Sequence, residues 1–181
     1  MRRFQDGAAA LFLNGRFAVA KQEKTNVMRV LDRAGIPYSH YSYEHNGNEA
    51  VDGVTVAQRI GRPVGQVFKT LVTRGASRNF FVFVIPVAEE LDLKAAAAAV
   101  GEKSVEMIHV AELCGVTGYI RGGCSPIGMK KHFRTVVDAS AEAFDTIIFS
   151  AGKIGAQVEL APAALAELVG CTFAPLTKQN R

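Results

Sequence analysis

The stretch VFKTLVTRGASRNFFVFVI, residues 67–85, contains two runs of β-branched and aromatic residues with a short polar segment between them. Such runs favour β-strands, and the intervening RGASRN has the length and composition of a hairpin loop. The second run, at 80–85, is apolar at every position, which is typical of a central strand covered on both faces. The stretch therefore predicts a strand pair in the middle of a sheet.

Further runs of this kind predict strands on both sides of the hairpin. They lie at residues 38–44, 104–108, 118–121, 134–138, 146–150, 156–160 and 172–175. Periodicity and capping residues predict helices between Thr25 and Gly35 and at 55–60, 93–100, 109–114 and 162–169. The expected fold is a mixed α/β (α+β) domain. Its sheet would be largely antiparallel and curled, with about six to eight strands and helices packed outside.

The composition is that of an ordinary globular domain, with 49% hydrophobic and 21% charged residues in a chain of 181. No apolar run reaches the roughly 18 residues that a membrane helix needs. The formal net charge of +4 permits weak binding to a polyanion such as RNA without requiring it. The three cysteines have no close pair, which predicts free thiols, no structural zinc site and a reducing cytoplasm.

Residues 1–24 differ from the rest of the chain. Two arginines precede an apolar stretch, as in a secretory signal, but the sequence Asn-Gly-Arg at 14–16 interrupts that stretch. The longest apolar piece, at 8–13, is shorter than a typical signal core. We therefore expect residues 1–24 to be a poorly ordered or loosely docked extension. Residues 25–181 would form a single domain of a cytoplasmic protein that does not associate with a membrane.

Lys69 interrupts a strand whose neighbours are apolar. A lysine at such a position either emerges at the solvent face or points into a site. In a site, its ammonium would bind a phosphate or carboxylate as a point charge. The pattern alone is compatible with both interpretations.

The segment TGYIRGGCSPIGMKKH, residues 117–132, contains four glycines and Pro126 within eleven positions. Glycines let a backbone approach a ligand closely and turn its amides toward a carbonyl oxygen or an anion. Lys130 and Lys131 follow directly and could meet a nucleic-acid backbone. A plain tight turn beside a solvated basic face would have the same sequence.

Two other chemical interpretations find little support. Cys124 lies beside glycines, but GGCSPIG matches no thiol-hydrolase signature and no partner histidine can be assigned to it. A metal site built from His40 and His45 lacks a third ligand. The phosphate loop, the G-x-S-x-G elbow, H-E-x-x-H and C-x-x-C are absent. A nucleotide triphosphatase, an α/β-hydrolase and a zincin are therefore not expected.

Several motifs in a fixed order resemble the YbaK/EbsC family of aminoacyl-tRNA editing proteins, specifically the bacterial Cys-tRNA(Pro) deacylases. Within residues 24–178 they are KTNVMRVLDRAGIPY, YEHNG, QVFKTLV, FVFVIPVAEELDLK, KSVEMI, TGYIRGGCSPIGMKK and SAGKIGAQVELAP. The resemblance implies a partly barrel-like sheet surrounded by helices. It also implies hydrolysis of mischarged Cys-tRNA(Pro), or of Cys-tRNA(Cys), without a metal or other cofactor.

The resemblance further implies which residues form the site. Lys69 matches the family's lysine and would hold the terminal adenosine or its phosphate, and the amides of the G-x-x-x-P loop would support the oxyanion. The implied catalytic residues are Lys69, Gly122, Gly123, Ser125 and Pro126. The implied substrate-binding residues are Tyr43, Phe68, Thr70, Cys124, Ile127, Gly128, Gly152 and Gln157, with Lys130 and Lys131 as candidates for binding tRNA. Some members carry an aspartate where this chain has Gln157, which cannot act as a base.

The implied mechanism needs no protein nucleophile. The substrate's cysteinyl thiol attacks its own ester carbonyl, and the cysteine is released from the tRNA as a thiolactone. The resemblance also implies association with prolyl-tRNA synthetase, which would supply selectivity for the tRNA. Three alternatives stay open at this point. The protein could edit another mischarged tRNA such as Ala-tRNA(Pro), it could be a non-catalytic module that binds tRNA or a synthetase, or it could be a hydrolase that uses Cys124.

Overall fold

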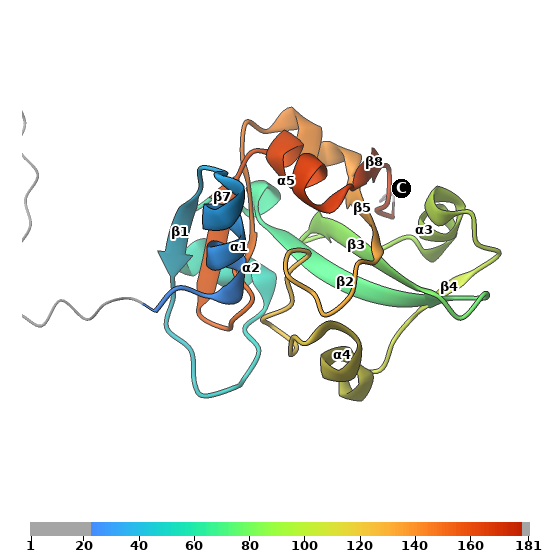
Figure 1. Cartoon of the computed structure of the whole chain (residues 1–181), viewed down its shortest axis with the longest axis horizontal. Helices are drawn as coiled ribbons and strands as arrows, with labels where there is room; N and C mark the ends of the chain where they lie inside the picture. The colour runs from blue at the N-terminus through green and yellow to red at the C-terminus, as the bar shows by residue number, and fades with distance from the viewer. Residues whose placement is uncertain (1–22, 179–181) are drawn as a thin grey trace, which may run out of the picture.

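The hairpin expected at residues 67–85 forms the middle of the larger sheet (Figure 1). In the computed structural model, which describes residues 23–178, β2 (Phe68–Gly75) and β3 (Phe80–Pro86) pair antiparallel with Lys69 opposite Ile85. β3 lies between β2 and β5, and all of its residues except Phe80 are buried. The expectation of a central strand covered on both faces is therefore confirmed.

The described residues contain eight strands in two sheets. The larger sheet has the order β4–β2–β3–β5–β8 and includes β4 (Val105–Met107), β5 (Arg134–Asp138) and β8 (Thr172–Ala174). The smaller has the order β1–β7–β6 and consists of β1 (Ser39–Ser42), β6 (Ile147–Ser150) and β7 (Ala156–Leu160). The β3–β5 and β5–β8 pairings are parallel and the others antiparallel. The α+β class is confirmed, although the strands form two sheets and no closed barrel.

The helices begin and end at the kinds of residue that the sequence offers for this purpose. They are α1 (Asn26–Ala34), α2 (Gly53–Arg59), α3 (Leu93–Val100), α4 (Val110–Thr117) and α5 (Pro162–Val169), with short 3₁₀ turns η1 (Val64–Gln66) and η2 (Ala139–Ala143). The Thr25 hydroxyl accepts the Met28 amide at the start of α1. α2 begins earlier than expected because the carboxylate of Asp52 accepts the Thr55 amide.

The two faces of β3 belong to two hydrophobic cores. Val82 and Val84 pack in a core with residues of α1, α5, β6 and β7. Phe81, Phe83 and Ile85 pack in a second core with residues of α3. Since successive side chains of a strand point to opposite faces, burial on both sides requires an apolar residue at every position.

The two sheets meet where β2 begins. Val67 forms an isolated parallel bridge with Ile148 of β6, and both pack with Ala57 of α2 and with Val87. This junction positions the site, because β2 leads from it to Lys69 and the smaller sheet carries Gln157 on β7.

The prediction of a strand at residues 118–121 is wrong. Gly118, with φ +85°, ends α4 in the left-handed conformation, and the chain continues as a loop. The Tyr119 hydroxyl donates to the Ile127 carbonyl at 2.5 Å, so this aromatic residue is buried within the loop and not in a strand.

Two expectations concern the ends and exterior of the molecule. The N-terminal extension expected at residues 1–24 lies outside the described residues, except for its last two positions. Between residues 23 and 178, no helix has the length and hydropathy that crossing a bilayer would require.

Candidate active site

A cavity of about 110 Å³ lies between β2 and the smaller sheet, with α2 and the glycine-rich loop also contributing to its walls. It brings together seven of the residues predicted from the sequence, which are Tyr43, Phe68, Lys69, Thr70, Gly122, Cys124 and Gln157. These residues come from positions up to 114 apart in the chain. Their convergence on one cavity makes it the candidate active site.

Lys69 contributes the positive charge of this cavity. Its ammonium donates one hydrogen bond, to the Val87 carbonyl at 3.1 Å, which leaves further donors for a ligand. Burial lowers the pKa of Lys69 below its usual value, and the nearby carboxylates of Glu90 and Glu89 partly oppose that shift. The partly desolvated ammonium is therefore poised to bind an anionic or carbonyl oxygen.

Three polar side chains of the cavity make no hydrogen bond among residues 23–178. The Thr70 hydroxyl oxygen is buried and unpaired. The Tyr43 hydroxyl and the side-chain amide of Gln157, in residues that are 8% and 5% exposed, also make none within this part of the chain. Because an unpaired buried polar group is unfavourable, a bound ligand that pairs with these groups would be stabilised.

The glycine-rich loop begins with a tight turn against this cavity. The Gly123 amide donates to the Ile120 carbonyl at 3.0 Å, and Gly122 has φ +84°, as expected for the third residue of a type II turn. A Cβ on Gly122 would also lie 2.9 Å from the Cβ of Ala50. The turn therefore requires glycine for both its conformation and its close packing.

The amides of this loop are only partly available to a ligand. The Gly123 amide is used by the turn, and Pro126 has no amide proton. The Ile127 amide donates to the Ser125 hydroxyl at 3.3 Å. The amides of Gly122 and Cys124, two residues that line the cavity, make no hydrogen bond within residues 23–178, so these two are the candidate oxyanion donors.

The Cys124 thiol lacks the environment of a nucleophile. Burial raises its pKa to about 12, so the thiol stays protonated near neutral pH, and no histidine lines the cavity. An activated cysteine needs a lowered pKa or an adjacent base, and neither is present here.

We therefore expect Cys124→Ala to keep esterase activity on a charged tRNA within about threefold of wild type, since a protonated thiol contributes no nucleophilic catalysis. The matched control is Cys171→Ala. Burial raises the pKa of that thiol to about 11, and Cys171 does not line the cavity. Initial rates of deacylation measure both variants. A loss of two orders of magnitude in Cys124→Ala alone would instead identify a cysteine hydrolase.

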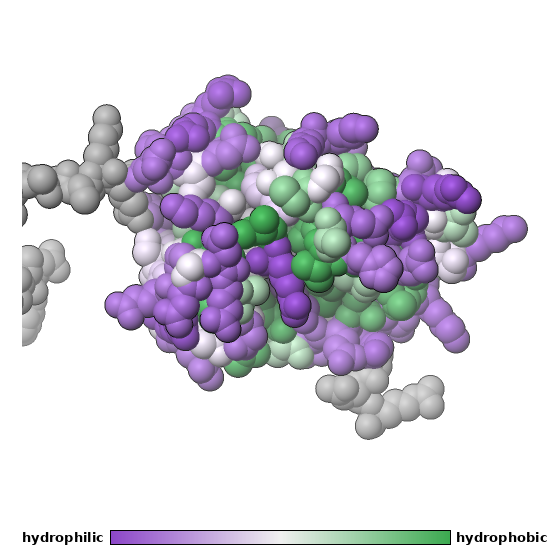
Figure 2. Space-filling model, turned by 90° about the horizontal axis from the view of Figure 1, so that it is seen from below, coloured by the Kyte–Doolittle hydropathy of each residue, from purple (hydrophilic) through white to green (hydrophobic). Residues whose placement is uncertain are grey.

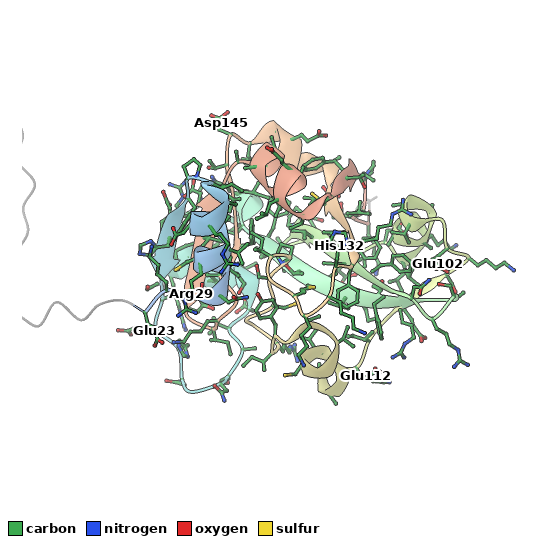
Figure 3. The ribbon with its side chains drawn as sticks, in the orientation of Figure 1. Glu23, Arg29, Glu102, Glu112, His132 and Asp145 are labelled. Atoms are coloured by element: carbon green, nitrogen blue, oxygen red, sulfur yellow. The ribbon has the colours of Figure 1, made fainter. Side chains whose placement is uncertain are left out.

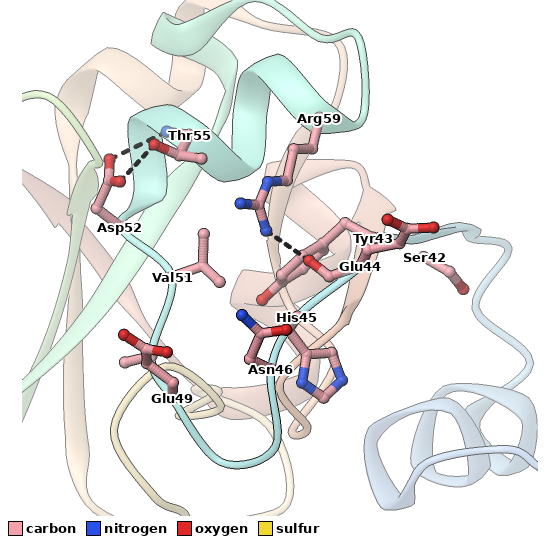
Figure 4. A pocket seen from close by; sticks show the side chains of 11 residues that line it. Ser42, Tyr43, Glu44, His45, Asn46, Glu49, Val51, Asp52, Thr55 and Arg59 are labelled. Carbon is pink, nitrogen blue, oxygen red and sulfur yellow. Dashed lines mark hydrogen bonds between the residues drawn. The ribbon is translucent and has the colours of Figure 1, made fainter.

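A larger open hollow of about 1120 Å³ adjoins the cavity (Figure 4). Tyr43 and Val51 line both spaces, and the hollow continues along the 43–52 segment to Arg59, whose guanidinium donates to the Glu44 carbonyl at 2.5 Å. Its acidic residues are Glu44, Glu49 and Asp52. The face that contains α4, seen from below in Figure 2, has hydrophobic residues near its middle between hydrophilic ones.

The structure separates the remaining predicted residues from this cavity. Pro126, Ile127, Gly128, Lys130 and Lys131 line a different cavity of about 240 Å³, which they share with His132 and residues of α1 and α5. Gly123, Ser125 and Gly152 line neither cavity. Gly152, with φ +87°, packs closely against Tyr119 and Val27.

Sequence reasoning missed six lining residues, which are Val51, Gly53, Val56, Val67, Val87 and Ser150. Most are apolar and look like any core residue, so they carry no signal of function. Gly53 is the exception, because a glycine in the first turn of a helix could have indicated close packing at that position. A Cβ there would lie 2.3 Å from Val87. The possible metal pair also stays incomplete, since residues 23–178 contain no cluster of three or more His, Cys, Asp or Glu that could hold an ion.

Comparison with solved structures identifies the class of fold. The crystal structure of a candidate trans-editing enzyme for prolyl-tRNA synthetase aligns with a TM-score of 0.72 at 23% identity, covering 84% of this chain and 95% of that one. The hypothetical protein APE2540 aligns with a TM-score of 0.75 at 21% identity, covering 84% and 99%. The two sheets with their surrounding helices are therefore the fold of these proteins.

Sequence comparison identifies the family. The model of the aminoacyl-tRNA editing domain matches residues 48–168. EbsC of Enterococcus faecalis (strain ATCC 700802 / V583), named as a candidate Cys-tRNA(Pro)/Cys-tRNA(Cys) deacylase, is 47% identical over 159 residues, which is 88% of this chain and 96% of EbsC. The chain belongs to the aminoacyl-tRNA editing domain family. The expectation of an editing deacylase is thus confirmed at the level of the family.

Proposed function

We propose that this protein removes cysteine from mischarged Cys-tRNA(Pro), and from Cys-tRNA(Cys), by cleaving the aminoacyl ester. The observation that carries the proposal is a cavity of about 110 Å³ that combines an ammonium with unpaired polar groups. Since a water molecule in the liquid occupies about 30 Å³, this volume suits a side chain of a few non-hydrogen atoms. The identity to EbsC supports cysteine as that amino acid.

Each wall of the cavity has a proposed role. The Lys69 ammonium would hold the ester or the neighbouring adenosine, and the amides of Gly122 and Cys124 would stabilise negative charge on the carbonyl oxygen. Tyr43, Thr70 and Gln157 would pair with the amino acid. The wide hollow beside the cavity has room for the terminal adenosine, whose hydroxyl and amino donors suit its carboxylates.

In the proposed reaction the substrate's own thiolate is the nucleophile. Its sulfur forms a bond to the ester carbonyl carbon, the bond from that carbon to the ribose oxygen breaks, and the ribose oxygen takes up a proton. Water then opens the resulting thiolactone to free cysteine. Such a mechanism discriminates by chemistry as well as by size, because alanine and proline bring no thiol. It requires neither a metal nor a cofactor.

We also propose which residues contact the tRNA backbone and how the protein selects its tRNA. Phosphates would avoid the acidic hollow and could contact Lys130 and Lys131 beside the second cavity. With a net charge of only +4, the protein would bind tRNA weakly and obtain selectivity from association with prolyl-tRNA synthetase in the cytoplasm.

The test is a parallel deacylation assay with Cys-tRNA(Pro), Ala-tRNA(Pro) and Pro-tRNA(Pro), followed by mass spectrometry of trapped products. We expect cleavage of the cysteinyl ester at least about 100-fold faster than of the other two, because only cysteine supplies a nucleophile held next to the ester. Preferential cleavage of Ala-tRNA(Pro) would point to the alternative substrate. Inertness toward all three would identify a binding module instead.

A further inference from the structure

A partly buried charged cluster lies where the two sheets join, outside the residues discussed above, with the Arg62 side chain 34% exposed. Its centre is Glu159 of β7, which is 9% exposed. The carboxylate pairs with Arg62 at 2.8 Å and accepts hydrogen bonds from Thr146 at 2.6 Å, Gln66 at 3.2 Å and the hydroxyl of Tyr41. The Arg62 guanidinium also lies over the Tyr41 ring, 5.8 Å from its centre. One carboxylate therefore holds four side chains from three segments, because Arg62 and Gln66 lie in the same turn.

These segments continue into the walls of the cavity. Glu159 follows Gln157 by two residues on β7, so both side chains point to the same face of the smaller sheet. Gln66 immediately precedes Val67, where the two sheets join, and its side-chain amide also donates to the Thr146 carbonyl at 3.0 Å. The cluster thus ties the start of the strand that carries Lys69 to the strand that carries Gln157.

Stability alone gives no reason for an ion pair at this junction. Burial by itself would raise the pKa of Glu159, but its bonds to Thr146 and Tyr41 and the Arg62 charge lower it, so the carboxylate is ionised at neutral pH. Replacing a buried ion pair with hydrophobic residues is often neutral or stabilising. What hydrophobic residues would not reproduce is directional bonding between particular segments.

We propose that the Arg62–Glu159 cluster is a positioning device that sets the spacing between Lys69 on β2 and Gln157 on β7, and with it the size of amino acid that the cavity accepts. The inference rests on the proposed function. Arg62 and Glu159 do not line the cavity, so they act through the residues that do.

The decisive variant is Arg62→Met combined with Glu159→Met. We expect its melting temperature to stay within a few degrees of wild type, because both charges are removed together. The kcat for Cys-tRNA(Pro) should fall about tenfold or more with KM nearly unchanged, since the reacting groups lose their alignment. Pro-tRNA(Pro), which brings no thiol and is not cleaved, should become a stronger competitive inhibitor of Cys-tRNA(Pro) cleavage as the cavity loses its fixed width. If the cluster only stabilised the fold, a variant with wild-type stability would change neither kcat nor this inhibition.

The matched control is Arg74→Met combined with Glu112→Met. This ion pair of 2.5 Å also involves β2 but links it to α4 at the periphery of the molecule, where Figure 3 labels Glu112. Wild-type kcat and selectivity are expected for it. The inference fails if the Arg62/Glu159 double variant keeps wild-type kcat and selectivity, or if both pairs cause the same loss. Should the double variant melt early, Glu159→Gln, which keeps the size of the side chain but loses its charge and one accepting oxygen, must change selectivity in the same direction. Inactive wild-type protein would refute the proposed function and the positioning role with it, whereas active wild-type protein beside an unchanged double variant would refute the positioning role alone.

Discussion

Lys69→Ala is expected to lower kcat/KM for Cys-tRNA(Pro) by about 10²–10³, which is the usual effect of removing one preorganised charged or hydrogen-bonding group from a reacting oxygen. The reason is geometric as well as electrostatic. The ammonium is held at the cavity wall by the Val87 carbonyl, so it meets the substrate without reorganising. Single-turnover deacylation with excess enzyme measures the chemical step directly.

Comparison of Lys69→Ala with Lys69→Met separates the effect of the ammonium charge from that of side-chain packing. Lys69→Met keeps the aliphatic stem and should lose as much activity as Lys69→Ala. Burial lowers the pKa of Lys69, so the folded state binds this proton more weakly than the unfolded state does. The ionised lysine therefore costs stability at pH values below its pKa in the folded state, and Lys69→Met should melt no lower than wild type at pH 7. Near-normal activity of Lys69→Met would mean that the ammonium has no catalytic role.

The sequence contained enough information for most of the fold. The β-branched and aromatic runs at residues 67–85 predicted the central hairpin, and the capping residue Thr25 marked a helix that the structure contains. The error at 118–121 has a physical cause. Burial of Tyr119 within a loop produces the same local composition as a strand. The way the two sheets join depends on long-range contacts such as the Val67–Ile148 bridge, which no local sequence pattern predicts.

The candidate site was predictable only where its residues are chemically unusual for their surroundings. Lys69 interrupts an apolar strand and Gly122 belongs to a glycine-rich segment, and both were predicted. Val56 and Val87 were missed, because a valine that lines a cavity has the same sequence signature as one in a core. The charged residue Glu159 was missed as well, since its partners come from segments up to 118 residues away.

Gly122→Ala is the second substitution for which we expect a large loss, of about 100-fold in kcat/KM, because displacement of catalytic groups by about 1 Å has effects of this size. Gly122 has φ +84°, a conformation that costs an L-residue about 1–2 kcal/mol. The added methyl would also lie 2.9 Å from the Ala50 Cβ and 3.0 Å from its Cα, so the loop or the 43–52 segment must move. Both line the cavity or its adjoining hollow, and Cys124 with its free amide follows two residues later.

Gly101→Ala is the control for Gly122→Ala, because it adds the same backbone strain without displacing neighbouring residues. Gly101 ends α3 with φ +72°, but nothing lies within 4 Å of the position that its Cβ would take. Both variants should therefore lose about 1–2 kcal/mol of unfolding free energy from the backbone conformation, and Gly122→Ala more because of its contact with Ala50. Only Gly122→Ala should lose activity. Urea denaturation gives the first quantity and single-turnover deacylation the second. Equal activity in the two variants would show that the turn at 120–123 does not position the reacting groups.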